Sequence, residues 1–178
     1  MNQAVFLDRD GVINEVLTNR VKYVNKPSNL YILDGVGESI KQLNESGFLV
    51  FVVTNQGGIG LGYMTDEMLE TIHVVMREKL AKQGAIIDDI SYCSHRPNSG
   101  CPCRKPKAYM LQQLASNHNV DLSKSFMVGD REPDILAGKE AGCRTVLVHA
   151  RSKQSYGADA VFENLKHALP WILQYKSK

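Results

Sequence analysis

The chain has 178 residues, of which 43% are apolar and 22% are charged, and its formal net charge is +2. These values are those of an ordinary globular protein, so they exclude a disordered or fibrous chain. The small, evenly spread charge speaks against nucleic-acid binding, and no run of apolar residues is long enough to span a bilayer.

Hydrophobic periodicity predicts strands and helices in alternation along the chain. In chain order, the predicted elements are a strand at 4–8, a helix at 36–46, a strand at 48–53, a helix from the N-cap Thr65 to just before Gly84, a strand at 87–93, a helix at 106–118, a strand at 125–128, a short helix ending at Gly142, a strand at 145–148 and a helix at 164–175. Such alternation is typical of an α/β fold with a doubly wound, Rossmann-like parallel sheet. Because no linker or repeat divides the sequence, we expect a single domain over residues 1–178.

Polar side chains follow the predicted strands at the edge where doubly wound sheets bind ligands. Asp8 and Asp10 follow the first strand, Thr54 follows the second, and Asp130 follows the fourth. Two acids one residue apart repel each other unless a cation or a proton lies between them. An Asp-Gly pair can also be a simple turn that closes a strand, but the other segments favour a site. The sequence therefore predicts metal-assisted chemistry on an anion.

Phosphoryl transfer is the chemistry that these groups fit best. Asp8 or Asp10 can attack phosphorus, while the other protonates the departing oxygen and then activates water. Mg²⁺ suits a site rich in oxygen atoms, and we expect Asp8 and Asp130 to bind it. Thr54 and Lys105 can stabilise the phosphoryl oxygens by hydrogen bonding and charge.

The glycine-rich segment 56–62 lies between a strand and a helix, as a dinucleotide-binding loop does. The fingerprint fails, however, because its third glycine would fall on Tyr63. We instead expect a flexible loop whose backbone approaches a phosphate or a sugar, with Asn55, Gln56 and Gly57 as substrate contacts.

A second cluster has the spacing C-x-H-x5-C-x-C, formed by Cys93, His95, Cys101 and Cys103. Four such ligands can close a tetrahedral zinc site with no open position, which is typical of structural zinc. Chance clustering of buried thiols is the alternative. We expect a zinc-binding loop at 93–103 that holds Arg104 and Lys105 over the active site. The other histidines lack metal-ligand spacing and are expected to be structural: His73, His118, His149 and His167.

Four motifs resemble those of the haloacid dehalogenase superfamily of phosphatases. They are Asp8-Arg9-Asp10-Gly11, Thr54-Asn55-Gln56, Arg104-Lys105-Pro106 and the segment from Gly129 to Asp134. The resemblance implies that Asp8 is the nucleophile and Asp10 the general acid and base. It also implies that Thr54 and Lys105 stabilise the phosphoryl group. The implied Mg²⁺ ligands are Asp8, Asp130 and the backbone carbonyl of Asp10.

Within the superfamily, the zinc loop next to Cys103-Arg104-Lys105-Pro106 resembles the capless branch of heptose bisphosphate phosphatases and histidinol-phosphatases. We favour hydrolysis of the C7 phosphate of D-glycero-D-manno-heptose 1,7-bisphosphate, with Arg104 on the distal phosphate and Arg131 beside the metal. Histidinol phosphate is the alternative, because the zinc loop is short. The loop at 14–26 departs from both patterns, and we expect it to lie above the site.

Two further functions are less favoured. A zinc-stabilised binding module without turnover would leave Asp8, Asp10, Lys105 and Asp130 unexplained. A polynucleotide phosphatase would need a basic groove with stacking aromatic groups. We therefore expect the partner to be a small phosphorylated metabolite, bound by a monomer in the cytoplasm, with neither nucleic acid nor membrane involved.

Overall fold

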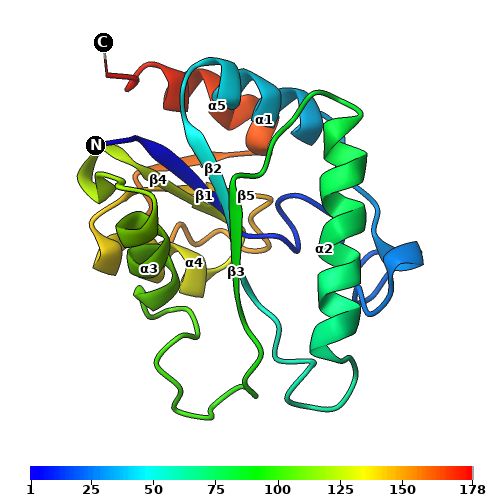
Figure 1. Ribbon diagram of the computed structural model, residues 1–178. Helices are drawn as coiled ribbons and strands as arrows, with labels where there is room; N and C mark the ends of the chain where they lie inside the picture. The colour runs from blue at the N-terminus through cyan, green and yellow to red at the C-terminus, as the bar shows by residue number, and fades with distance from the viewer. Residues whose placement is uncertain (178) are drawn as a thin grey trace.

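Six parallel strands form one sheet in the order β3-β2-β1-β4-β5-β6, and helices cover both of its faces (Figure 1). The computed structural model describes residues 1–177. The strands are β1 Ala4–Leu7, β2 Leu49–Asn55, β3 Asp89–Cys93, β4 Phe126–Gly129, β5 Arg144–Val148 and β6 Ala160–Phe162. The helices are α1 Val36–Glu45, α2 Asp66–Ala81, α3 Tyr109–Asn117, α4 Glu132–Ala141 and α5 Leu165–Leu173, with 3-10 turns at Pro27–Asn29 and Leu122–Lys124. The predicted α/β fold class is confirmed.

The core has two layers because successive residues of a strand point to opposite faces of the sheet. Val5 and Leu7 of β1 pack in the layer that contains residues of α1, α2 and α5. Ala4 and Phe6 pack in the layer that contains residues of α3 and α4. The central strands are thus apolar on both sides, as the continuous apolar runs of the sequence predict.

Most element boundaries follow local signals in the sequence. Thr65 caps α2, since its side chain accepts a hydrogen bond from the Met68 N–H at 3.1 Å. Gly142 ends α4 in the left-handed region with φ of 85°. The predicted helix at 106–118 begins only at Tyr109, because the peptide groups of Lys105 are bonded to the Asn55 side chain. Strand β6 was not predicted, because three residues are too few to give a pattern.

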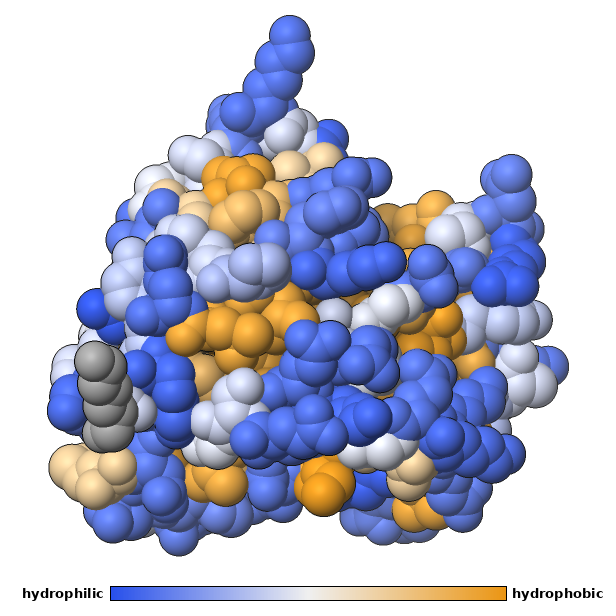
Figure 2. Space-filling view, turned by 90° about the horizontal axis from the view of Figure 1, so that it is seen from above, coloured by the Kyte–Doolittle hydropathy of each residue, from blue (hydrophilic) through white to orange (hydrophobic). Residues whose placement is uncertain are grey.

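Helices α1 and α5 cover the side of the molecule seen from above in Figure 2. Hydrophilic side chains predominate on this face, and apolar atoms show as separate patches between them. Among residues 1–177, none of the helices is both long and apolar enough to cross a membrane.

The register of the sheet brings the ends of three strands together. Leu7 of β1 lies beside Val52 of β2 on one side and beside Val128 of β4 on the other. The backbone N–H of Asp8 continues this pairing by donating to the carbonyl of Val128 at 3.0 Å. The segments that follow β1, β2 and β4 therefore begin next to one another.

Candidate active site

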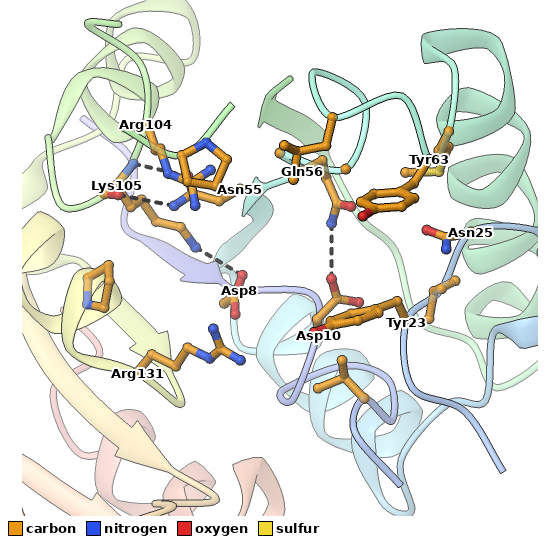
Figure 3. Close-up of a pocket in the computed structure, with 18 of the residues that line it drawn as sticks. Asp8, Asp10, Tyr23, Asn25, Asn55, Gln56, Tyr63, Arg104, Lys105 and Arg131 are labelled. Atoms are coloured by element: carbon orange, nitrogen blue, oxygen red, sulfur yellow. Dashed lines mark hydrogen bonds and ion pairs between the residues drawn. The ribbon is translucent and has the colours of Figure 1, made fainter. Parts of the chain in front are cut away.

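A cleft of about 780 Å³ opens at this edge of the sheet (Figure 3). Eight of the residues predicted to form the site line it, namely Asp8, Asp10, Asn55, Gln56, Gly57, Arg104, Lys105 and Arg131. The loop at 14–26 also contributes to the lining, with Val16, Lys22, Tyr23, Val24 and Asn25, so it lies over the site as predicted. Thr54 and Asp130 are buried beneath the cleft, at 1% and 3% exposure.

Lys105 is a buried cation held between two carboxylates. Its Nζ lies 2.9 Å from Asp8 Oδ1 and 2.7 Å from Asp134 Oδ1, and it donates to the carbonyl of Val53 at 2.7 Å. Burial alone would lower the pKa of Lys105, but Asp134 and Asp8 together raise it above its ordinary value. Asn55 fixes the backbone of Lys105 through two hydrogen bonds of 3.0 Å. The ammonium is therefore permanently charged and aimed at Asp8.

Three carboxylates lie together at and just beneath the floor of the cleft, beside this buried ammonium. One oxygen of each of Asp8, Asp130 and Asp134 lies within 4.8 Å of the others. Burial, followed by the charge of Asp134, raises the pKa of Asp8 well above its usual value, against the effect of Lys105. The same two causes raise the pKa of Asp130. Burial and mutual repulsion thus make the cluster costly to ionise fully in the absence of a further cation.

The oxygens left free in this cluster suit a divalent cation. Both oxygens of Asp134 are occupied, one by Lys105 and the other by the N–H groups of Asp130 and Arg131 at 3.1 Å each. Arg151 donates to Asp130 Oδ2 at 2.8 Å, whereas the buried Oδ1 of Asp130 has no partner among residues 1–177. An unpartnered buried carboxylate oxygen beside Asp8 is the kind of ligand that Mg²⁺ takes.

Asp10 differs from Asp8 in its environment. Its Oδ1 accepts hydrogen bonds from Arg9 at 3.0 and 3.2 Å and from Asn14 at 2.9 Å, and its Oδ2 accepts one from Gln56 at 3.1 Å. Burial acts to raise the pKa of Asp10, but Arg9 and the hydrogen bonds outweigh it and hold that pKa below its usual value. The pKa of Asp8 is therefore raised and that of Asp10 is lowered, although the two aspartates lie in one loop. Such a difference is expected for groups with different catalytic roles.

Gln56 connects Asp10 to Thr54. Its Nε2 donates to Asp10 Oδ2 at 3.1 Å and to Thr54 Oγ1 at 2.9 Å. Since Thr54 Oγ1 accepts this hydrogen bond, its own proton is available for another acceptor. The arrangement leaves a hydroxyl donor at the end of β2, directly beneath the cleft.

Arg104 lies against the glycine-rich loop. A Cβ atom at position 57 would lie 3.1 Å from Arg104 Nη1 and 3.0 Å from Pro97, so any side chain there would have to push one of these neighbours aside. The Nη1 atom of Arg104 is buried and has no hydrogen-bond partner among residues 1–177. A guanidinium nitrogen in this state is an available donor for an anion.

The predicted zinc ligands are gathered at the end of β3, which supplies Cys93, and in the loop that follows it. Cys103 Sγ lies 3.0 Å from Cys93 Sγ and 3.1 Å from His95 Nδ1, and Cys101 Sγ lies 3.6 Å from Cys93 Sγ. One ligand atom of each of these residues lies within 4.8 Å of the others, and all the cysteines are free thiols. This spacing fits four ligands around one tetrahedral metal ion.

The structure adds three groups that the sequence reasoning did not single out. Asp134 holds Lys105, and its place at the third position of α4, in the segment Gly129 to Asp134, was the available signal. Arg151 binds Asp130 from the loop after β5, for which the sequence offers no signal. His73, expected to be structural, lies 3.1 Å from the buried guanidinium of Arg9.

Comparison with known proteins shows what the chain is similar to. A family model described as HAD-hydrolase-like matches residues 102–168. A D-glycero-beta-D-manno-heptose-1,7-bisphosphate 7-phosphatase of Haemophilus ducreyi is 37% identical over 182 residues, which cover 96% of this chain and 98% of that protein. A protein of the same name from Helicobacter pylori is 36% identical, over 96% of this chain and 97% of its own length.

A solved structure agrees with these relatives. The D,D-heptose 1,7-bisphosphate phosphatase from B. bronchiseptica, in complex with magnesium and phosphate, superposes with a TM-score of 0.87. It is 32% identical, and the match covers 97% of this chain and 98% of that one.

Proposed function

The chain belongs to the haloacid dehalogenase superfamily of phosphatases, and from this premise we propose that it hydrolyses the C7 phosphate of D-glycero-D-manno-heptose 1,7-bisphosphate. The ion pair of 2.9 Å between Lys105 and Asp8, at the floor of the cleft, is the observation that carries the proposed mechanism. The relatives are named for the β anomer, and we extend this preference to the present chain.

In the first proposed step, an oxygen of Asp8 attacks phosphorus and the bond from phosphorus to the sugar oxygen breaks. Lys105 binds Asp8 Oδ1, which leaves Oδ2 for the attack. Asp10 gives a proton to the departing sugar oxygen, so that the sugar leaves as an alcohol. Lys105 and the hydroxyl of Thr54 offset the charge on the transferred oxygens. The product of this step is an aspartyl phosphate on Asp8.

In the second step, Asp10 removes a proton from a water molecule, which attacks the aspartyl phosphate and frees Asp8 and inorganic phosphate. The lowered pKa of Asp10 in the free protein suits this role as a base. A bound phosphate dianion would raise that pKa and so favour the protonated form that the first step needs.

Mg²⁺ bound by Asp8, Asp130 and the backbone carbonyl of Asp10 would supply positive charge to the phosphoryl oxygens. The unpartnered Oδ1 of Asp130 supports this ligand set. Arg131, which lines the cleft next to Asp130 in the sequence, is proposed to contact the same phosphate.

A panel of substrates tests the function. Phosphate release with Mg²⁺ is measured on both anomers of heptose 1,7-bisphosphate and on histidinol phosphate. We expect a large preference for the β anomer of the bisphosphate. A preference for histidinol phosphate would contradict the proposed substrate and would favour the alternative suggested by the short zinc loop.

Arg104 is proposed to bind the second phosphate, on the strength of its unpartnered Nη1. Replacing Arg104 with alanine should lower kcat/KM for the bisphosphate by roughly 10- to 100-fold, the equivalent of one hydrogen bond to a charged group. Turnover of heptose 7-phosphate, which lacks the second phosphate, should change little. Arg96→Ala removes an exposed arginine of the same loop and is the control. Equal losses on both substrates would contradict the assignment.

We also propose that the cluster at 93–103 binds one structural zinc ion, supported by the ligand spacing. Cys101→Ser should remove most of the zinc measured by atomic absorption and lower the Tm by about 4–8 °C, as expected for a loss of about 2 kcal/mol in a chain of this length. Cys143→Ala, a thiol outside the cluster, is the control for zinc content. Unchanged zinc content and melting in Cys101→Ser would refute the structural role.

The remaining expectations stay predictions. They are one domain over residues 1–178, a monomer, a cytoplasmic location, and action on a small phosphorylated metabolite without nucleic acid or membrane. The relatives' names support the phosphorylated sugar.

A further inference from the structure

The guanidinium of Arg9 is fully buried beside the cleft, at 0% exposure. Its Nε and Nη2 donate to Asp10 Oδ1, at 3.2 and 3.0 Å, and its Nη1 lies 3.1 Å from His73 Nε2. A buried guanidinium is costly unless its donors are bonded, so these partners decide how it lies. With one edge on Asp10 and the other on His73, the plane of the guanidinium is fixed.

His73 is a hydrogen-bond acceptor in this arrangement. It belongs to α2, is 6% exposed, and packs edge-on against Tyr92 with ring centroids 6.1 Å apart. Burial, followed by the charge of Arg9, lowers the pKa of His73 to about 3, so the imidazole is neutral near pH 7. Arginine has only donors, and Nε2 must therefore be the unprotonated nitrogen of the ring.

The fixed guanidinium of Arg9 determines which oxygen of Asp10 is free to exchange a proton. Three donors occupy Oδ1, namely two from Arg9 and one from Asn14, and an oxygen with its lone pairs engaged in this way cannot also carry the proton for a leaving group. Within the described residues 1–177, only Gln56 donates to Oδ2. The carboxylate is thus turned so that Oδ2 is the oxygen left to exchange a proton with the substrate.

We propose that His73 is a positioning residue for Asp10, acting through the buried guanidinium of Arg9. This inference rests on the proposed function, in which Asp10 is the general acid and base. Without the acceptor on α2, the guanidinium turns to find another partner for Nη1, and the Asp10 carboxylate loses its fixed orientation. A displacement of about 1 Å at a reacting group can cost about 100-fold in rate.

The test compares His73→Leu, which removes the acceptor, with His73→Gln, which restores one. Single-turnover release of the leaving group is measured with heptose 1,7-bisphosphate and with p-nitrophenyl phosphate. The sugar oxygen must be protonated to leave, whereas p-nitrophenolate leaves unprotonated, so only the first substrate depends strongly on correct placement of the acid.

We expect His73→Leu to lower the rate with the sugar phosphate by about 30- to 100-fold, with KM unchanged within about threefold. Release of p-nitrophenolate should fall by less than about fivefold, and His73→Gln should recover most of the lost rate. Ile72→Ala, which truncates a fully buried neighbour on α2, should lower the Tm and leave both rates unchanged. His73→Ala, a smaller side chain that also lacks an acceptor, replaces His73→Leu if the latter does not fold.

Equal losses on the two substrates, or no loss in either acceptor-free variant, would overturn the proposal. Failure of the proposed function would look different. In that case Asp10→Asn would itself leave release of the sugar intact, whatever the behaviour of the His73 variants.

Discussion

Replacing Asp8 by asparagine is expected to lower phosphate release by about ten-thousand-fold or more, because an amide oxygen cannot form the covalent intermediate. The fold should be preserved, since the amide keeps the shape of the side chain and its oxygen still accepts a hydrogen bond from Lys105. Turnover is measured with heptose 1,7-bisphosphate in the presence of Mg²⁺. Residual activity near that of the wild type would refute the assignment of Asp8 as the nucleophile.

Asp10→Asn is the matched variant, since it changes the neighbouring carboxylate in the same way. It should still form a phosphoenzyme with p-nitrophenyl phosphate, whose leaving group needs no proton, but it should hydrolyse the intermediate slowly. Asp8→Asn should form none. The opposite pattern would exchange the roles of the two aspartates.

The same Asp8→Asn variant should be at least as stable as the wild type at pH 7. Folding raises the pKa of Asp8, mainly through burial, so the folded chain holds more protons than the unfolded chain between pH of about 4 and the raised value. The wild type therefore loses stability as the pH rises through that window, and the variant lacks this contribution. Urea unfolding without added Mg²⁺ should show the difference growing from pH 4 to pH 7.

Replacing Lys105 by methionine should have the second largest effect, on both activity and stability. The ammonium at 2.9 Å from Asp8 and 2.7 Å from Asp134 is the buried cation that meets both carboxylates. Its removal leaves two buried carboxylates without this partner, which costs about 3–5 kcal/mol in comparable cases. The loss of a preorganised charge at the phosphoryl group should lower kcat by about 100- to 1,000-fold.

The stability loss in Lys105→Met should depend on pH in a defined direction. Without the cation, which lowers the pKa of Asp8, that pKa rises further, so protonation of Asp8 relieves the repulsion as the pH falls. The deficit in the free energy of unfolding should then be smaller at pH 5 than at pH 7. Lys82→Met, which removes an exposed lysine of similar length, is the control and should show no such deficit.

Much of this architecture could be predicted from the sequence because its signals are local. Continuous apolar runs such as 48–53 indicate strands that are buried on both faces, and Thr65 and Gly142 mark helix ends by their own conformational preferences. The clustering of Cys and His side chains at 93–103 was predictable for the same reason, since all four lie within eleven residues.

Three contacts of the site could not be predicted from the sequence, because they depend on how distant segments pack together. His73 lies 64 residues from Arg9 in the sequence, and only the packing of α2 against the β1 loop brings them together. Arg151 reaches Asp130 from a loop whose conformation no periodicity describes. Asp134 belongs to the motif from Gly129 to Asp134, but its contact with Lys105 depends on how α4 packs against the segment after β3.

The pairing of β1 with β4 fixes the positions of the residues that follow these strands, whereas the loops over the cleft are not fixed in this way. Parallel strands lie about 4.8 Å apart, so the distance between the residues that follow Leu7 and Val128 is set by backbone hydrogen bonds. The groups over the mouth of the cleft, such as Tyr23 and Tyr63, stand on loops outside this ladder. Protein engineers can therefore exchange residues 16–26 to redirect the enzyme toward another phosphomonoester, while the sheet and the bond from Asn14 to Asp10 preserve its hydrolytic apparatus.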